Sequence, residues 1–382
     1  MFTVCQYLKN MIKKYPTKSH LLISASFLLF AIASCKKDNK SNVTQPVTAT
    51  PTSFGLYESD SSIYKELNTA ISKIGTYSVD YPILFDTGSG GMVIDANSIL
   101  PASMITSSGF NFTGDSTVVG GITITNQKSI IEYGDDNATT DKVYGNLAYA
   151  SVTVGDQPTG SITIKRLPFF IYYKAVDGQG AEYGPHEFDT FGVSSEYDLS
   201  FANNVNIMSP LSYFVPGTGL TSGFKMAPLG TSNFSYDGGY VSNAVILGLT
   251  ADDLASSSGF SMTQLDYIAG DGYAPIIPGT ITYNGKAVTT DIVFDTGTEP
   301  YSFIEDPTFS GNTTLLQVNS PISVATTSGF NYSYTTSASD NLTYVENPNT
   351  SGGEVSVMSL EFFLTNSYLL DYADDKLGLK SN

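Results

Sequence analysis

Short runs of alternating apolar and polar residues fill most of the chain, and turn dipeptides separate them. A period of two places every second side chain on one face, so it predicts half-buried β-strands. Ile281 to Val288 is the clearest case, because Asn284-Gly285 supplies the two positive-φ positions of a tight hairpin turn. Further strands are predicted at 122–125, 151–154, 161–164, 244–249 and 377–379. The pattern favours an all-β protein.

Helical periodicity is scarce in the chain. Residues 63–74 have an apolar spacing that fits a helix, but they also fit a hairpin that leads into Gly75-Thr76. One short turn of helix is predicted over 361–366. No repeat with a period of 20–50 residues is found, which argues against a solenoid or propeller.

One seven-residue phrase occurs twice. Ile83-Leu84-Phe85-Asp86-Thr87-Gly88-Ser89 returns as Ile292-Val293-Phe294-Asp295-Thr296-Gly297-Thr298. A single Asp-Thr-Gly after a strand is often an ordinary turn, since aspartate starts turns well. Two copies with matched apolar lead-ins instead indicate two related half-molecules, each of which brings one carboxylate to a shared site.

Two facing carboxylates could carry out hydrolysis without any other catalytic group. Close together they share one proton, because both cannot ionise cheaply. The ionised member can take a proton from a bound water, while the protonated member polarises a carbonyl. Asp86 and Asp295 are therefore the candidate catalytic residues, with no covalent intermediate, no cofactor and no metal.

The residues after each aspartate suit supporting roles. Gly88 and Gly297 allow the two backbones to approach closely, which a side chain would prevent. The hydroxyl side chains can bond either to the opposite loop or to the outer carboxylate oxygens. We expect Thr87 and Thr296 in the first role, and Ser89 and Thr298 in the second.

Charge and composition remove several other classes of function. The formal net charge is −18, so nucleic acid and anionic membrane surfaces are not expected partners. The chain has two cysteines, and only His186 lies outside the N-terminal leader, so zinc clusters and multi-histidine metal sites are excluded. A Ser-His-Asp site would depend on His186, which sits in a Tyr-Gly-Pro-His-Glu sequence typical of an exposed loop.

The N-terminus has the pattern of an export signal. Basic residues precede an apolar run from Leu21 to Ala33, which is too short to span a bilayer comfortably. It ends in Ile-Ala-Ser-Cys35, similar to the bacterial lipobox, in which the cysteine becomes a lipidated N-terminus. The alternative is an ordinary signal peptide with an accidental cysteine. We expect residues 1–34 to be the lipoprotein signal and 35–60 a flexible tether.

Around Asp86 and Asp295 the chain resembles the pepsin-like aspartic peptidases, in a bacterial lipoprotein form. The resemblance continues in Ile74-Gly75-Thr76, in Ile131-Glu132-Tyr133-Gly134 as the flap tip, and in Phe188-Asp189-Thr190-Phe191-Gly192 behind the catalytic loop. It also includes Val245-Ile246-Leu247-Gly248 and the segment 363–379, and covers roughly 67–380.

The resemblance implies a bilobal all-β acid protease fold, with two pseudo-twofold-related lobes, a central cleft and a flap. It implies N-terminal and C-terminal catalytic lobes over 61–250 and 251–382, with Asp86 and Asp295 as the dyad and Tyr133 and Gly134 over the substrate. The implied activity is endopeptidase cleavage of extended, apolar-flanked peptides. We expect a monomer, anchored through Cys35 in the bacterial cell envelope, that is made active without a pro-segment.

Three departures from the family pattern bear on activity. Leu360 takes the place of a glycine in the second lobe, Glu299 follows the second motif where a small residue is usual, and no tryptophan partners the flap tyrosine. Tyr133 could then be a plain strand aromatic. Two alternatives remain: an inactive pepsin-fold module that binds peptide or carbohydrate at the cell surface, and an unrelated β-sandwich lipoprotein.

Overall fold

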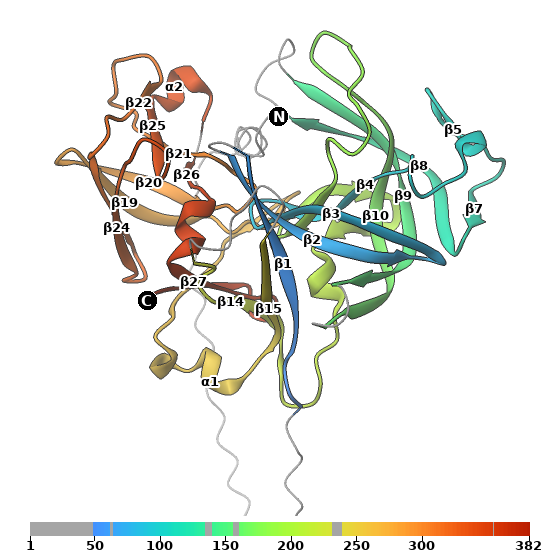
Figure 1. The fold of residues 1–382 in the computed structure, drawn as a ribbon, viewed down its shortest axis with the longest axis horizontal. Coiled ribbons are helices and arrows are strands. Elements are labelled where there is room, and N and C mark those ends of the chain that lie inside the picture. Colours follow the sequence, from blue (N-terminus) through green and yellow to red (C-terminus); the bar gives the residue numbers. More distant parts are fainter. Residues whose placement is uncertain (1–48, 62–63, 134–139, 156–159, 231–238, 354) are drawn as a thin grey trace, which may run out of the picture.

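Strands make up nearly all of the regular structure, as the alternating sequence pattern predicts (Figure 1). The structure is a computed structural model that describes residues 49–61, 64–133, 140–155, 160–230, 239–353 and 355–382. Helical structure in this part of the chain is confined to single turns: α1 (Ala251–Leu254), α2 (Pro348–Ser351), and the 3₁₀ helices η3 (Ala102–Met104), η4 (Ala202–Asn204), η5 (Pro210–Tyr213), η6 (Ser256–Ser258) and η7 (Leu360–Leu364).

The larger sheet joins strands from both ends of the chain. In spatial order it contains β16 (Ser261–Gln264), β28 (Lys376–Ser381), β27 (Asn366–Asp371), β14 (Thr221–Met226), β15 (Gly239–Leu249), β1 (Thr52–Ser61), β2 (Tyr64–Ile74), β3 (Tyr77–Asp86), β11 (Thr190–Val193), β4 (Gly90–Asp95), β10 (Ile162–Val176), β9 (Asp141–Val154), β8 (Ile122–Tyr133) and β7 (Ser116–Val119). Because β14 pairs with β27, the last strands of the chain are bonded to strands from its first two thirds.

The smaller sheet belongs to the second half of the chain. In spatial order it contains β22 (Thr314–Leu315), β25 (Leu342–Glu346), β21 (Tyr301–Glu305), β26 (Ser356–Met358), β20 (Lys286–Phe294), β19 (Ile277–Tyr283), β23 (Pro321–Thr326) and β24 (Asn331–Thr335). Three separate two-stranded pairs complete the described strands: β5 (Ile105–Thr106) with β6 (Gly109–Phe110), β12 (Tyr197–Phe201) with β13 (Val205–Met208), and β17 (Tyr267–Ile268) with β18 (Gly272–Tyr273).

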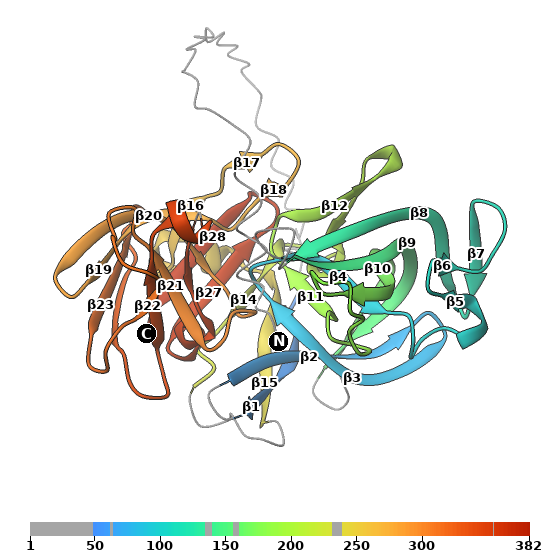
Figure 2. The same cartoon turned by 90° about the horizontal axis from the view of Figure 1, so that it is seen from above.

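The strands form two lobes on either side of a shared central layer. Figure 1 shows the smaller sheet on one side and β3, β4, β8, β9 and β10 on the other, with β1, β14, β15 and β27 between them. Figure 2 shows the same division from above. The predicted boundary at residue 250 falls between β15 and α1.

The hairpin predicted over 281–288 is confirmed. Tyr283 of β19 pairs with Lys286 of β20, and Asn284 and Gly285 between them have φ of 48° and 80°. Both residues therefore occupy the left-handed region that this turn requires. The helical turn predicted near residue 361 is also present, as η7.

Two expectations for the N-terminal region are settled by strand pairing. Residues 64–74 form β2, so the hairpin alternative is correct and the helix alternative is wrong. The tether predicted over 35–60 is wrong from residue 52, because β1 lies between β15 and β2. Phe54, Leu56 and Glu58 of β1 are fully buried, in the alternation typical of a strand. Residues 35–48 lie outside the described part of the chain.

Candidate active site

Each Asp-Thr-Gly sequence follows a buried strand that has the same neighbours in both lobes. In the first lobe β3 pairs in parallel with β11, which also pairs with β4. In the second lobe β20 pairs in parallel with β26, which also pairs with β21. The side chains of Phe85 and Phe294, one residue before each aspartate, are fully buried. The repeated sequence therefore folds into a repeated structure.

The two loops are joined by four hydrogen bonds across the lobes. The Thr87 N–H donates to Thr296 Oγ1 and the Thr296 N–H to Thr87 Oγ1, both at 3.0 Å. Thr87 Oγ1 donates to the carbonyl of Phe294 at 2.8 Å, and Thr296 Oγ1 to that of Phe85 at 2.7 Å. All four are buried, so each threonine fixes the position of the opposite loop.

The carboxylates are held in matching ways within their own loops. The Gly88 N–H donates to Asp86 Oδ1 at 2.7 Å, and Ser89 Oγ donates to Asp86 Oδ2 at 2.7 Å. The Gly297 N–H donates to Asp295 Oδ1 at 2.8 Å, and Thr298 Oγ1 donates to Asp295 Oδ2. Each carboxylate thus has one backbone donor and one hydroxyl donor, which fix its plane.

The carboxyl group of each aspartate lies against the glycine of the other loop. A Cβ added to Gly88 would lie 2.6 Å from Asp295 Cγ, and one added to Gly297 would lie 2.7 Å from Asp86 Cγ. Burial raises the pKa of Asp86 well above its usual value, and so do the charge of Asp295 and a hydrogen bond with its carboxyl. The pair therefore holds a proton at pH values where an isolated aspartate would have lost it.

Comparisons with known proteins agree with this architecture. No protein-family model matches the sequence, and no curated protein matches it significantly. Among solved structures, the aspartic proteinase from Irpex lacteus has a TM-score of 0.53 at 17% identity, over 86% of this chain and 97% of its own. The basic 7S globulin from soybean (11% identity, 87% and 95% coverage) and the protein edgp (12%, 87% and 95%) both have TM-scores of 0.52. The chain has the bilobal pepsin-like fold.

The close approach of the Asp86 carboxyl to the second loop requires glycine at position 297. In a Gly297→Ala variant the added methyl would displace the Asp86 carboxyl. Because a misplacement of about 1 Å can cost about 100-fold in rate, we expect at least that loss of peptide hydrolysis, measured as kcat/KM. Gly184→Ala is the matched control, since its Cβ would meet only the end of the Glu187 side chain at 3.7 Å. Equal activity in both variants would contradict the placement of Gly297.

The dyad is closed off from solvent. Asp86 and Asp295 both have 0% exposure, so a peptide can reach them only if neighbouring segments move. In Figure 2 the end of β8 lies near the middle of the molecule. Tyr133 is the last residue of β8, and its ring stacks on Phe188 at 5.4 Å. Its flap role stays a prediction, and Gly134 lies outside the described residues.

The first-lobe glycine behind the catalytic loop is where the resemblance implies. Gly192 of β11 pairs with Asp86, and a Cβ at this glycine would lie 2.6 Å from the carbonyl oxygen of Ser89. The close approach of β11 to the loop therefore depends on the missing side chain.

The matching position in the second lobe is Ser359. Met358 pairs with Phe294, the residue before the second aspartate, so the register puts Ser359 opposite that aspartate. The expectation that Leu360 occupies the glycine position is therefore wrong by one residue. Ser359 is a small, fully buried residue, and Leu360 begins η7 with its N–H donating to the carbonyl of Thr298 at 3.2 Å.

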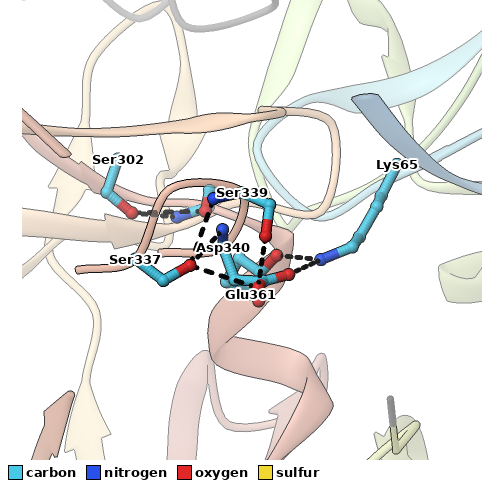
Figure 3. A network of polar contacts seen from close by, with 7 residues as sticks. Lys65, Ser302, Ser337, Ser339, Asp340 and Glu361 are labelled. Atoms are coloured by element: carbon cyan, nitrogen blue, oxygen red, sulfur yellow. Dashed lines mark hydrogen bonds and ion pairs between the residues drawn. The ribbon is translucent and has the colours of Figure 1, made fainter. Parts of the chain in front are cut away.

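An interlobe ion pair lies next to the second catalytic loop. Lys65 of β2 contacts Glu361 of η7 and also Asp340, whose carboxylate is 3.0 Å from the lysine Nζ (Figure 3). The side chains of Lys65 and Glu361 are 12% and 8% exposed. Glu299 lies within the field of both, and its two buried carboxyl oxygens have no hydrogen-bonding side chain beside them among the described residues. Glu299 stands out in the sequence, but its neighbours do not, since nothing in the sequence places β2 beside η7.

We expect Lys65→Met to destabilise the protein by about 3 kcal/mol, measured as the free energy of unfolding in urea. The substitution leaves the nearly buried Glu361 carboxylate without its cation, and breaking such pairs is costly. The double variant Lys65→Met/Glu361→Gln should recover most of the loss. If the single and double variants were equally unstable, lost packing rather than lost charge would explain the effect.

Clusters of possible metal-ligating side chains are absent from the described part of the chain. No group of three or more histidine, cysteine, aspartate or glutamate side chains there is arranged to hold an ion. The same residues include no helix with the length and apolar character needed to cross a membrane.

Proposed function

We propose that this protein is an aspartic endopeptidase that cleaves extended, apolar-flanked peptides. One observation supports this most: two loops from different lobes present Asp86 and Asp295 to each other, each against the other's glycine. Two matched Asp-Thr-Gly loops that bond to each other support a joint role of the two aspartates in one reaction.

In the proposed mechanism the two carboxyl groups share one proton, which Asp86 holds in the resting state because its pKa is raised by burial and by its partner. The ionised Asp295 removes a proton from a water between the two groups. The water oxygen adds to the scissile carbonyl, whose oxygen accepts the Asp86 proton. The resulting gem-diol breaks its C–N bond when the proton held by Asp295 passes to the leaving amine and one of its hydroxyls returns a proton to Asp86, which leaves a carboxylic acid and the original protonation state.

The test is digestion of unfolded haemoglobin or casein between pH 3 and pH 7, with and without a statine-type transition-state analogue. We expect cleavage that is fastest in acid, because the mechanism needs a singly protonated pair. The statine should stop it. Absence of cleavage at every pH, with the protein folded, would overturn the proposal.

A catalytically silent binding module is the second candidate, and the complete burial of both aspartates favours it. In that case peptides would bind without being cut. Mass spectrometry of a peptide library after incubation separates the two functions, since an endopeptidase leaves new termini and a binding module leaves every peptide intact.

For location, we propose that the chain is exported and anchored by lipid at Cys35 in the bacterial cell envelope, as a monomer with peptide or protein as its substrate. The basic leader, the apolar run and the lipobox-like Ile-Ala-Ser-Cys sequence support this. In a bacterial host fed labelled palmitate, the chain should carry label and the Cys35→Ser variant should not. Equal labelling of the two would contradict the assignment.

A further inference from the structure

His186 lies in the loop that its sequence context predicts, but its side chain is only partly exposed. It lies between β10 and β11, and its side chain is 30% exposed. His186 Nδ1 is 2.7 Å from Asp189 Oδ2, and His186 Nε2 is 2.7 Å from Ser98 Oγ. The imidazole therefore joins a hydroxyl on one side to a carboxylate on the other, which is the order of contacts in a serine nucleophile, a base and an orienting acid.

Asp189, the carboxylate that contacts His186, is held in place by the core. The Asp189 side chain is 4% exposed, and its Oδ1 accepts a hydrogen bond from the Asp95 N–H at 2.6 Å. Its Oδ2 contacts the imidazole, and the Tyr172 hydroxyl also hydrogen-bonds to this carboxylate. When Nδ1 carries a proton and donates it to Asp189, Nε2 is left as the acceptor that faces Ser98.

The histidine backbone is held in place by a second buried carboxylate. His186 has φ of 68°, in the left-handed region that residues other than glycine rarely adopt. Asp95 Oδ2 accepts the His186 N–H at 3.0 Å and Asp95 is 1% exposed, so this strained position is fixed from the core. Strained residues of this kind gather at functional sites.

Ser98, the hydroxyl that contacts His186, is open to solvent. Ser98 is exposed, in the turn that follows β4. The N–H groups around it are used within the turn, since that of Asn97 donates to Asp95 and those of Ile99 and Leu100 donate to the carbonyl of Ala96. Among the described residues, the Ser98 N–H has no acceptor. In chymotrypsin-like serine proteases the N–H of the nucleophile itself is one of the oxyanion donors.

We propose that Ser98, His186 and Asp189 form a second hydrolytic site, separate from the aspartate dyad, that accepts the acyl group of small carboxylic esters. Ser98 is the nucleophile, His186 is the general base and Asp189 is the positioning residue. The site opens directly to solvent, so its substrates are soluble esters with an accessible carbonyl.

The reaction needs only the ester and one water molecule. Ser98 Oγ forms a bond to the acyl carbon as His186 Nε2 takes the hydroxyl proton. The C–O bond to the alcohol then breaks, and the alcohol leaves with the proton from Nε2. Water next attacks the acyl-serine and loses a proton to Nε2. Release of the carboxylic acid returns that proton to Ser98.

This site should have a pH dependence opposite to that of the dyad. The hydrogen bond to Asp189 is the largest cause that raises the pKa of His186 above its usual value; burial opposes it, and the charges of Asp189 and Asp95 add to it. A protonated imidazole cannot accept the serine proton, so acylation should rise with pH through the His186 pKa. Peptide hydrolysis by the dyad should fall over the same range.

The experiment uses the full chain with a fluorophosphonate probe and with p-nitrophenyl acetate, in the presence of the statine inhibitor. We expect one phosphonyl group per chain, mapped to Ser98, with labelling faster at pH 8 than at pH 5. His186→Gln should slow labelling by about 100-fold or more, the scale of general-base catalysis. Ser98→Ala should abolish it.

Ser107→Ala is the matched control, because Ser107 is also exposed and lies in a nearby turn. It should label like the parent chain. The proposal is overturned if the label is absent or spread over several serines, if His186→Gln labels at the parent rate, or if Ser98→Ala still hydrolyses p-nitrophenyl acetate at that rate. Circular dichroism of each variant checks that the fold is kept. Because the statine is present throughout, the result does not depend on the dyad being active.

Discussion

Asparagine at position 86 or position 295 is expected to lower peptide hydrolysis by about 10⁴-fold or more, measured as kcat on an unfolded protein substrate. An amide at position 295 can neither take a proton from the water nor pass one to the leaving amine, and an amide at position 86 cannot protonate the scissile carbonyl oxygen. The cross-lobe threonine bonds do not involve these side chains, so the fold should survive.

The matched control is Asp252→Asn, since Asp252 is exposed in the first turn of α1, away from the dyad. This variant should cleave at the parent rate. If Asp86→Asn or Asp295→Asn kept the parent rate while remaining folded, the proposed mechanism would be refuted and the binding function would become the leading candidate.

The second large effect is a loss of stability as the solution becomes more alkaline. Burial raises the pKa of Glu299 to about 9, with a further rise from Glu361 and an opposing effect of Lys65. Burial alone raises the pKa of Glu58 to about 7. Both carboxyls are harder to ionise in the folded chain than in the unfolded one. Their contribution to stability is therefore complete below pH 4.5 and is lost as the pH rises toward these values.

We expect the free energy of unfolding to fall between pH 5 and pH 9, by up to about 5 kcal/mol from Glu299 if the full pKa difference is realised. Urea unfolding at several pH values measures the slope. Glu299→Gln, which keeps the shape and removes the ionisation, should flatten the curve above pH 7. Glu58→Gln should flatten it mainly between pH 5 and pH 7. If neither variant changed the slope, these two carboxyls would not be its source.

In strongly acidic solution the free energy of unfolding changes in the opposite direction and falls as the pH decreases. Hydrogen bonds from Lys286, Tyr283 and Thr308 outweigh burial and lower the pKa of Asp306 to about 2. Its contribution is present above the ordinary aspartate pKa and is lost as the pH falls toward 2. The two trends together place the greatest stability in mildly acidic solution, which is also where the proposed peptidase works.

The sequence was sufficient for the fold class and for the equivalence of the two Asp-Thr-Gly loops because these depend on local pattern. Alternation predicts strands, and the repeat of Asp-Thr-Gly with its apolar lead-in identifies the two equivalent loops. The roles expected for the paired threonines and hydroxyls depend only on residues within each phrase. The structure has the same contacts in both copies.

Features that depend on distant pairing could not be predicted in this way. β1 has the alternation of a strand in Phe54 and Leu56, but its Ser and Thr residues, preceded by Pro51, resemble a linker until β15 and β2 are seen on either side. The position of Ser359 needed the register of β26 against β20. Ser98 and His186 are nearly ninety residues apart, and no local signal brings them together.

The threonine bonds between the lobes, together with the pairing of β14 with β27, have a consequence for biosynthesis. β27 and β28 follow residue 365, so a ribosome has to synthesise the chain beyond this point before β27 can pair with β14 in the central layer and β28 can pair with β27. Until residue 295 is synthesised, the growing chain carries only Asp86 and has no working pair. A cell could therefore translate this protein without exposing its own nascent proteins to cleavage.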